Sequence, residues 1–252
     1  MKIEELDKVY NEDCLQALRR LPDNCVDLVV TDPPYEFNSG ASGGAFGANK
    51  RSYRAEYMKL GETNVRIHLG NTNRLISDGF DMAVLSECCR VLKKINAYVW
   101  CSKLQLRKLL TYFEDKGCTT DVLVWCKTNP TPACNNIYLS DIEYCVYARE
   151  KGVKLYGTMA TKHRYWLTPA NTADKKLYNH PTIKPLNIIQ TLIINSSKPN
   201  DIVLDPFMGS GTTAVACHRT GRHFIGYEIN EKYYNTACKR IDMEQRQTEL
   251  QF

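Results

Sequence analysis

The stretch DIVLDPFMGSGTTA, residues 201 to 214, constrains the fold more than any other part of the sequence. It reads as an apolar strand, then a glycine-rich turn, then the start of a helix. Gly209, Gly211 and Ala214 fit the spacing G-x-G-x-x-A, in which small residues let a ligand approach the backbone. The alternative is a tight strand-to-helix turn that holds no ligand. In either case the stretch predicts an α/β unit.

An acidic residue follows this turn at a distance typical of nucleotide-binding folds. Glu228 lies nineteen residues after Gly209, at the end of the next predicted strand. An acid at this place accepts hydrogen bonds from ribose hydroxyls, so the sequence predicts an adenosine-containing cofactor. GSGTT has no lysine after its second glycine, which excludes a phosphate-binding P-loop. Nicotinamide enzymes usually have such a turn near the start of the chain, with the catalytic domain after it. Here only 38 residues follow Ala214, so we expect the catalytic residues to lie before this turn.

The rest of the chain alternates between predicted strands and helices. Strands are predicted at KVYNED, VDLVVTD, AYVWC, TDVLVWCK, DIVLDPF and HFIGYEI. Helices are predicted at CLQALRRL, MAVLSECCRVLKK, LQLRKLLTYFEDKG and LNIIQTLIINSS, after GSGTT, and from Asn230. The fold class is therefore α/β, with a mostly parallel central sheet flanked by helices. A length of 252 residues with 43% hydrophobic residues suits one large core, and we expect one domain over residues 1–252.

The stretch TDPPYEF, residues 31 to 37, ends one of these strands with Asp32, Pro33, Pro34 and Tyr35. Prolines have no amide hydrogen and a fixed φ, so they end the strand ladder and hold the next residues extended. Asp32 and Tyr35 are then expected at the carboxyl edge of the sheet, where open α/β sheets bind ligands. Taken alone, the stretch is equally compatible with a strand terminator that carries an incidental acid.

Two segments carry basic residues suited to a polyanion. Residues 36 to 75 are irregular and rich in small residues, which is typical of a lid, a binding loop or disorder, and they include Lys50, Arg51 and Arg54. Residues 149 to 178, the basic segment, hold seven Lys or Arg, Lys162 and Arg164 among them, against two acids. Its net +5 equals the formal charge of the whole chain. With interleaved Tyr and Trp, it favours nucleic acid over the alternative of a solvated basic face.

Composition excludes several classes of protein. No run of about 18 apolar residues exists for a membrane span, and MKIEELDKVY lacks the apolar stretch of a signal peptide, so we expect a cytoplasmic location. None of the eleven cysteines forms a C-x-x-C pair. We expect reduced, mostly buried thiols rather than disulfides or a metal site.

Three motifs together resemble one known family, the amino-group DNA methyltransferases that use S-adenosylmethionine in the circularly permuted order called the beta class. DPPY at 32 to 35 is similar to the family's catalytic motif, DPFMGSGTT at 205 to 213 to its cofactor loop, and NHPTIKP at 179 to 185 to the segment before that loop. The resemblance extends over residues 8 to 243. It implies a Rossmann-like methyltransferase fold, double-stranded DNA as partner, no metal, and recognition of the target by about residues 128 to 178. Because dimers are common in the family, a homodimer is one expected state.

The catalytic motif implies a mechanism. A base amine is a poor nucleophile because its lone pair is delocalised into the ring. Asp32 and the Pro33 carbonyl would each accept an N–H hydrogen bond, and Asp32 would stabilise the positive charge that develops on nitrogen. Pro34 would help to hold these groups in place, and Tyr35 would stack on a base extruded from the duplex. DPPY favours the N6 amine of adenine, with the N4 amine of cytosine, an RNA methyltransferase and a non-catalytic DNA-binding protein as alternatives.

The resemblance also implies a cofactor site. Asp13 would meet the adenine amine, with the Cys14 backbone nearby, and Glu228 would hold the ribose hydroxyls. Taken singly, several of these residues have simpler interpretations, such as a helix cap for Asp13 or a surface position for Lys184. The remaining residues assigned to S-adenosylmethionine are those near its methionine and adenosine parts: Asp32, His180, Thr182, Lys184, Asp205, Phe207, Gly209, Ser210, Gly211 and Thr212.

Overall fold

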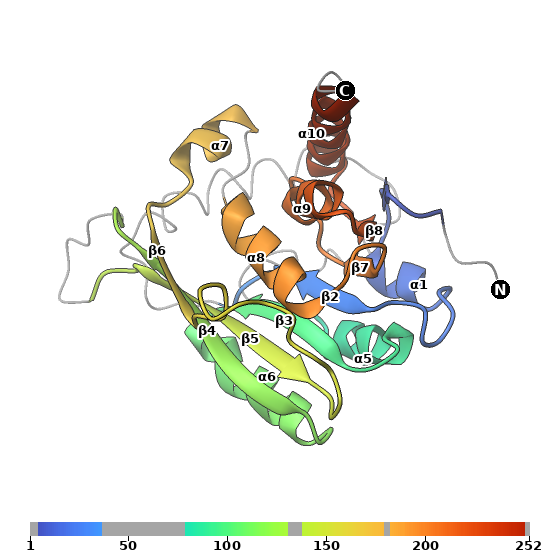
Figure 1. Cartoon of the computed structure of the whole chain (residues 1–252), viewed down its shortest axis with the longest axis vertical. Coiled ribbons are helices and arrows are strands. Elements are labelled where there is room, and N and C mark those ends of the chain that lie inside the picture. The colour runs from blue at the N-terminus through green and yellow to red at the C-terminus, as the bar shows by residue number, and fades with distance from the viewer. Residues whose placement is uncertain (1–4, 37–78, 131–137, 179–181, 250–252) are drawn as a thin grey trace, which may run out of the picture.

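An eight-stranded sheet organises the computed structural model, which describes residues 5–36, 79–130, 138–178 and 182–249 (Figure 1). The strands lie in the order β1-β8-β7-β2-β3-β5-β4-β6. Every neighbouring pair is parallel except the two that include β5. This confirms the predicted mostly parallel sheet. The bounds are β1 Lys8–Tyr10, β2 Leu28–Thr31, β3 Asn96–Cys101, β4 Thr119–Lys127, β5 Ile142–Arg149, β6 Tyr165–Thr168, β7 Ile202–Asp205 and β8 His223–Tyr227.

Helices cover both faces of this sheet (Figure 1). One face packs against α1, α5 and α6, and the other packs against α8, α9 and α10. A parallel sheet is stable in this arrangement because both of its faces are removed from water. The bounds are α1 Cys14–Leu18, α5 Met82–Val91, α6 Lys103–Glu114, α7 Thr172–Leu177, α8 Leu186–Ser196, α9 Thr212–Thr220 and α10 Glu231–Glu249.

Strand β3 shows how the sequence fills both layers of core. Successive side chains of a strand point to opposite faces of the sheet. Ala97 and Val99 pack with α1, α5 and α6, whereas Tyr98 and Trp100 pack with α8, α9 and α10. All four are at most 2% exposed, which explains why this strand reads as a continuous apolar run instead of an alternating one.

Short polar residues set the starts of the helices. The Asp13 carboxylate caps α1 and the Asp81 carboxylate caps α5, each by accepting a backbone N–H of the first turn. Ser102 and Gln105 form a reciprocal capping box at the start of α6. The Asn230 side chain accepts the backbone N–H of Lys232 at the start of α10. These bonds satisfy donors that a helix leaves open at its first turn.

The chain order places four strand ends together at one edge of the sheet. β1, β8, β7 and β2 are consecutive parallel neighbours, so their carboxyl ends meet at the same edge. α1 follows β1 onto one face, and α9 follows β7 onto the other. Such a reversal of the winding direction leaves a crevice beyond the strand ends, which is where open α/β sheets bind ligands.

Most predicted elements are confirmed, and the exceptions lie between residues 138 and 178. β5, β6 and α7 have no counterpart in the sequence prediction, and β5 lies inside the central sheet between β3 and β4. Most of the predicted loop at 36 to 75, with Lys50, Arg51 and Arg54, lies outside the described residues, as does His180.

Cysteines, metal-ligating side chains and helices are described here for the described ranges only. The ten cysteines in them are free thiols, and seven are buried. No group of three His, Cys, Asp or Glu side chains there is arranged to hold a metal ion. None of the helices found in those ranges has the length and apolar character needed to cross a membrane.

Candidate active site

Asp32 lies directly beyond the carboxyl end of β2, where Pro33 and Pro34 stop the strand ladder at Thr31. Its Oδ2 accepts a hydrogen bond from the Lys184 ammonium. Its Oδ1 is buried and has no hydrogen-bond partner within the described part of the chain. The Gln105 amide donates to the Pro34 carbonyl at 2.9 Å, so α6 holds the proline pair from outside the motif. The result is a fixed carboxylate with one acceptor atom open.

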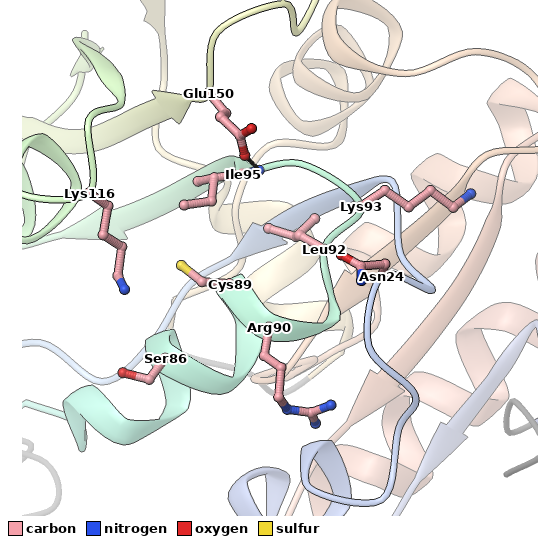
Figure 2. A pocket seen from close by; sticks show the side chains of 9 residues that line it. All are labelled: Asn24, Ser86, Cys89, Arg90, Leu92, Lys93, Ile95, Lys116 and Glu150. Atoms are coloured by element: carbon pink, nitrogen blue, oxygen red, sulfur yellow. Dashed lines mark hydrogen bonds between the residues drawn. The ribbon is translucent and has the colours of Figure 1, made fainter.

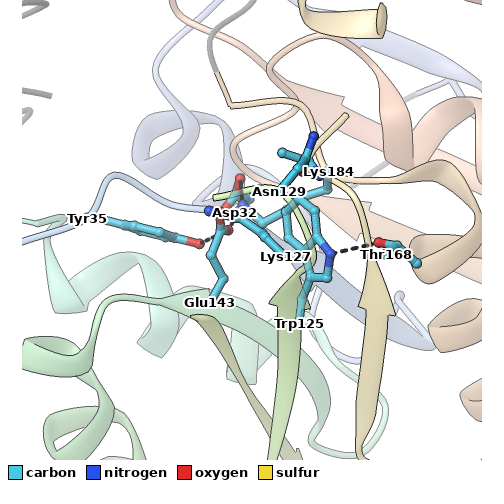
Figure 3. A network of polar contacts seen from close by, with 9 residues as sticks. Asp32, Tyr35, Trp125, Lys127, Asn129, Glu143, Thr168 and Lys184 are labelled. Atoms are coloured by element: carbon cyan, nitrogen blue, oxygen red, sulfur yellow. Dashed lines mark hydrogen bonds and ion pairs between the residues drawn. The ribbon is translucent and has the colours of Figure 1, made fainter. Parts of the chain in front are cut away.

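Asp32 is one of four charged side chains that lie next to one another with alternating negative and positive charge (Figure 3). Lys184 pairs with Asp32 and also with Glu143, with 3.1 Å between its Nζ and the Glu143 Oε2. Lys127 pairs with the other oxygen of Glu143 at 2.6 Å. The Tyr35 hydroxyl donates to Glu143 at 3.2 Å. We call Asp32, Lys184, Glu143 and Lys127 the charge chain; it joins the ends of β2, β4 and β5 to the segment before α8.

Burial and these pairs set the ionisation of the charge chain. Burial raises the pKa of Asp32; the Lys184 charge opposes this, and the Glu143 charge adds to it. Burial also acts to raise the pKa of Glu143, but the Lys184 and Lys127 charges outweigh it and lower that pKa to about 2. For Lys184, burial acts to lower the pKa, and Asp32 and Glu143 together raise it. Lys184 is therefore a fixed cation between two acids.

The turn after β7 forms the second part of the site, and we call residues 205–213 the glycine loop. Gly209 and Gly211 adopt φ values of 54° and 82°, the left-handed region that favours glycine. A Cβ on Gly211 would lie 3.1 Å from Ala237, so this glycine also lets α10 pack closely. The Gly209 amide donates to the Glu228 carboxylate at 2.9 Å. The two residues of the predicted nucleotide fingerprint are thus in direct contact.

Glu228 has acceptor capacity left for a ligand. One oxygen accepts the Gly209 amide and the other accepts the Asn230 amide at 2.8 Å. An ionised carboxylate has about four acceptor positions, so about two remain for a pair of vicinal hydroxyls. Burial raises the pKa of Glu228, and the two amide bonds oppose that shift. The site therefore fits the ribose of an adenosine group.

Asp13 and Cys14 lie near this carboxylate although they come from the opposite end of the chain. β1 pairs with β8, and the Asn11 side chain donates to the Glu228 carbonyl at 2.8 Å. Burial raises the pKa of the Cys14 thiol to about 12, and the charges of Asp13 and Glu228 add to that shift. The pairing of β1 with β8 and the Asn11 bond thus bring the segment that carries Asp13 and Cys14 close to Glu228.

Asp205 supports the glycine loop from inside the core. Its carboxylate accepts the Thr213 hydroxyl at 2.6 Å and the Phe207 amide at 3.1 Å. It is only 3% exposed, and burial raises its pKa to about 7. The Phe207 ring packs edge-on against Phe80. The structure thus gives Asp205 a structural role in the loop, whereas its predicted contact with a cofactor stays a prediction.

The other predicted residues fall into two groups. Ser210 and Thr212 are buried in the glycine loop, where both contact the Arg240 side chain. Thr182 is exposed, as are Lys162 and Arg164 of the basic segment, and the Arg164 guanidinium lies 3.4 Å from the Asp121 carboxylate. The role predicted for Lys184, facing a cofactor carboxylate, stays a prediction; in this structure its ammonium is paired with the two acids described above.

A separate hollow lies at the opposite edge of the sheet (Figure 2). It measures about 650 Å³, and Arg90, Lys93, Lys116 and Glu150 supply its charges. Arg90 donates to backbone carbonyls of the α1 region and pairs with two acids, and Lys93 pairs with Asp27. Because Arg90 and Lys93 already have acidic partners, the charge chain and the glycine loop are the stronger candidate for a functional site.

Three residues near the site were not predicted from the sequence: Glu143, Lys127 and Arg240. Glu143 lies in IEYCVYAR, where an acid interrupts a run of strand-forming residues, and such an acid signals a buried pair once the strand is recognised. Lys127 ends a predicted strand and Arg240 lies on the predicted last helix. Nothing local in the sequence connects either of them to Asp32 or to the glycine loop.

The chain is similar in sequence to known methyltransferases. The chain is 27% identical to the Type II methyltransferase M.HinfI of Haemophilus influenzae, over 94% of this chain and 68% of that protein. It is 26% identical to the Type II methyltransferase M.BglII of Bacillus subtilis, over 96% of this chain and 70% of that protein.

Solved structures share the fold. M1.HpyAVI in complex with SAM superposes with a TM-score of 0.66 at 23% identity, over 93% of this chain and 98% of that one. The cytosine-N4-specific PvuII DNA methyltransferase superposes with a TM-score of 0.66 at 16% identity, over 97% of this chain and 93% of that one. Residues 26–239 match the family N6_N4_Mtase, described as DNA methylase. The chain therefore belongs to the N6/N4 family of DNA methylases and is a DNA methyltransferase.

Proposed function

We propose that this protein transfers a methyl group from S-adenosylmethionine to the exocyclic N6 amine of adenine in double-stranded DNA. The observation that carries the proposal is the open acceptor of Asp32. Its Oδ1 is buried and has no partner among the described residues, while Oδ2 is held by Lys184. A buried acceptor without a donor is costly unless a ligand supplies one. An amine N–H of an extruded base is such a donor.

The cofactor site is built from residues that fit S-adenosylmethionine. Glu228 has acceptor positions for the ribose, Asp13 and Cys14 lie beside it, and Gly209 and its neighbours leave the backbone accessible. M1.HpyAVI, which shares the fold, is known in complex with this compound. When bound, S-adenosylmethionine supplies an electrophilic methyl group on a sulfonium. The order of the motifs, with DPPY before the glycine loop, supports the beta-class arrangement.

The chain's own residues then act on the amine. Asp32 Oδ1 and the Pro33 carbonyl accept its two N–H groups, which localises the nitrogen lone pair and stabilises the charge that develops there. Pro33 and Pro34 fix both acceptors. The Tyr35 hydroxyl is held by Glu143, which sets the orientation of the ring that stacks on the base. The roles of Thr182 and His180 near the methionine part remain part of the same proposal.

The choice of adenine rests on the motif and not on the fold, since the cytosine-N4-specific PvuII enzyme has the same fold. The test is to methylate duplex DNA, digest it to nucleosides and identify the product by mass spectrometry. We expect N6-methyladenine. If N4-methylcytosine is the sole product, the proposed substrate is wrong and the enzyme methylates cytosine. Methylation of RNA but not of duplex DNA would support the RNA methyltransferase alternative. Methylation of neither would support the non-catalytic DNA-binding alternative.

Recognition of DNA is assigned to the basic groups. Lys162 and Arg164 are exposed, so both can reach phosphates, and Lys50, Arg51 and Arg54 would join them from the long loop. We place target recognition in about residues 128 to 178 of the single domain. A homodimer is one of the states to test for by light scattering with and without DNA.

A further inference from the structure

The charge chain contains two acids and two cations. The mechanism above gives no role to Lys127 and uses Glu143 only to hold Tyr35. Side-chain exposure is 5% for Lys184, 13% for Lys127 and 18% for Glu143. The segments that carry them are far apart in the sequence and meet only in the folded sheet (Figure 3). Such an arrangement needs an explanation, because each buried charge costs several kcal/mol of hydration, as an order of magnitude.

Stability alone does not explain Glu143. Replacing a buried ion pair by apolar side chains of similar volume is often neutral or stabilising. Glu143 nevertheless uses both oxygens: one accepts from Lys127, and the other from Lys184 and Tyr35. Two of these three partners touch or belong to the catalytic motif. The contacts of Glu143 are therefore directed toward Asp32.

Building on the proposed function, we propose that Glu143 is a positioning residue for methyl transfer. Glu143 shares Lys184 with Asp32 and so keeps Asp32 a strong, oriented acceptor. Lys127 balances the charge of Glu143. If Lys184 were paired with Asp32 alone, the positive charge of Lys184 would neutralise the Asp32 carboxylate more fully. The Oδ1 atom would then be a weaker acceptor for the amine. A second acid on Lys184 limits this neutralisation and also fixes the position of the ammonium.

The ring contacts of Lys184 support the same role. Its Nζ lies 5.2 Å from the centres of both the Tyr35 and the Trp100 rings. The ammonium therefore contacts two rings as well as two carboxylates. The titratable groups that face the charge chain from the surrounding elements are Tyr35, Cys101, Cys145, Lys175 and Asp205.

The charges predict opposite effects for two substitutions. Glu143→Gln removes a negative charge, so the pKa of Asp32 falls and the acid limb of the pH–rate profile moves to lower pH. Lys127→Met leaves the charge of Glu143 unbalanced, so the pKa of Asp32 rises and the acid limb moves to higher pH. A purely structural role would not produce two shifts of opposite sign.

The test is single-turnover methylation of duplex DNA as a function of pH, with S-adenosylmethionine affinity measured by calorimetry. We expect Glu143→Gln to lower the rate by about 10- to 100-fold, as for a misplaced catalytic group, while cofactor affinity stays within about twofold. Glu143→Asp, which keeps the charge, should restore the position of the acid limb. The control is Glu114→Gln on α6, an exposed acid whose carboxylate bonds Thr120.

The outcomes separate this inference from the proposed function. A wild-type protein that methylates no DNA overturns the proposed function and this inference with it. Active wild-type protein, with both substitutions leaving the rate and the acid limb unchanged, overturns only the role of Glu143. Should Glu143→Gln fail to fold, Lys127→Met still decides, because an acid limb that does not move upward contradicts the proposal.

Discussion

The guanidinium of Arg240 lies 4.5 Å from the centre of the Tyr178 ring. Arg240 belongs to α10 and is buried, and Tyr178 directly follows α7 at the end of the basic segment. The Nη1 atom of Arg240 also donates to the Thr212 hydroxyl at 2.9 Å and to the Ser210 carbonyl at 3.3 Å. One side chain therefore joins the segment expected to meet DNA to the loop expected to meet the cofactor.

Arg240→Met should weaken cofactor binding. The substitution keeps an unbranched side chain of similar length but leaves the Ser210 carbonyl and the Thr212 hydroxyl without this donor. Unsatisfied buried groups cost about 1–3 kcal/mol, which corresponds to a loss of about tenfold or more in S-adenosylmethionine affinity if the glycine loop loosens. Calorimetric titration with S-adenosylmethionine measures this affinity. Arg246→Met, on an exposed turn of the same helix, is the matched control. A lower melting temperature with unchanged affinity would limit Arg240 to a role in folding.

Asp32→Ala should abolish most methyl transfer without unfolding the protein. Lys184 keeps Glu143 as a partner at 3.1 Å, so the substitution does not leave a buried ammonium unpaired. Loss of one preorganised electrostatic partner lowers the rate by about 10² or more, or roughly 3 kcal/mol. Single-turnover methylation beside calorimetric cofactor titration measures both effects, with Asp115→Ala, an exposed acid at the other edge of the sheet, as control.

Two other results for Asp32→Ala would change its assignment. Near-normal transfer would remove Asp32 from the mechanism. Loss of cofactor binding together with loss of the folded state would reassign the residue to structure.

Lys162→Ala combined with Arg164→Ala should weaken DNA binding and reduce its salt dependence. Both side chains are exposed, and the Arg164 pair with Asp121 at 3.4 Å is a surface contact of little weight for the fold. Each lost phosphate contact lowers the slope of log affinity against log salt by about one unit, so we expect a change of about two. Fluorescence anisotropy at several salt concentrations tests this. Lys93→Ala with Lys116→Ala, at the opposite edge of the sheet, is the control; equal slopes for both double variants would make the basic segment a solvated face.

The motifs that lie at strand ends could be found from the sequence, because local chemistry fixes them. Prolines after Asp32 must stop a strand, and glycines at 209 and 211 permit the positive φ values of a strand-to-helix turn. β5 escaped prediction because it pairs antiparallel with β3 and β4, a choice made by tertiary contacts and not by its own pattern. Glu143 was missed with it. Its significance depends on Lys184 and Lys127, which only the folded sheet brings within reach.

Asp205→Asn should remove a pH dependence of stability. The Asp205 carboxyl is buried, and burial raises its pKa from an ordinary value near 3.8 to about 7. Between these two values the folded protein holds a proton that the unfolded chain has released. The free energy of unfolding therefore falls as the pH rises from about 4 to about 7, by at most about 4 kcal/mol for this group.

The asparagine cannot titrate, and its oxygen and its amide can replace the contacts to the Phe207 amide and the Thr213 hydroxyl. We expect urea denaturation at pH 5, 6, 7 and 8 to show that the variant gains stability relative to the wild type as the pH rises. Asp115→Asn, an exposed acid, should show no such gain. Parallel curves for the wild type and Asp205→Asn would mean that Asp205 is ionised throughout this range, held so by the Thr213 and Phe207 bonds.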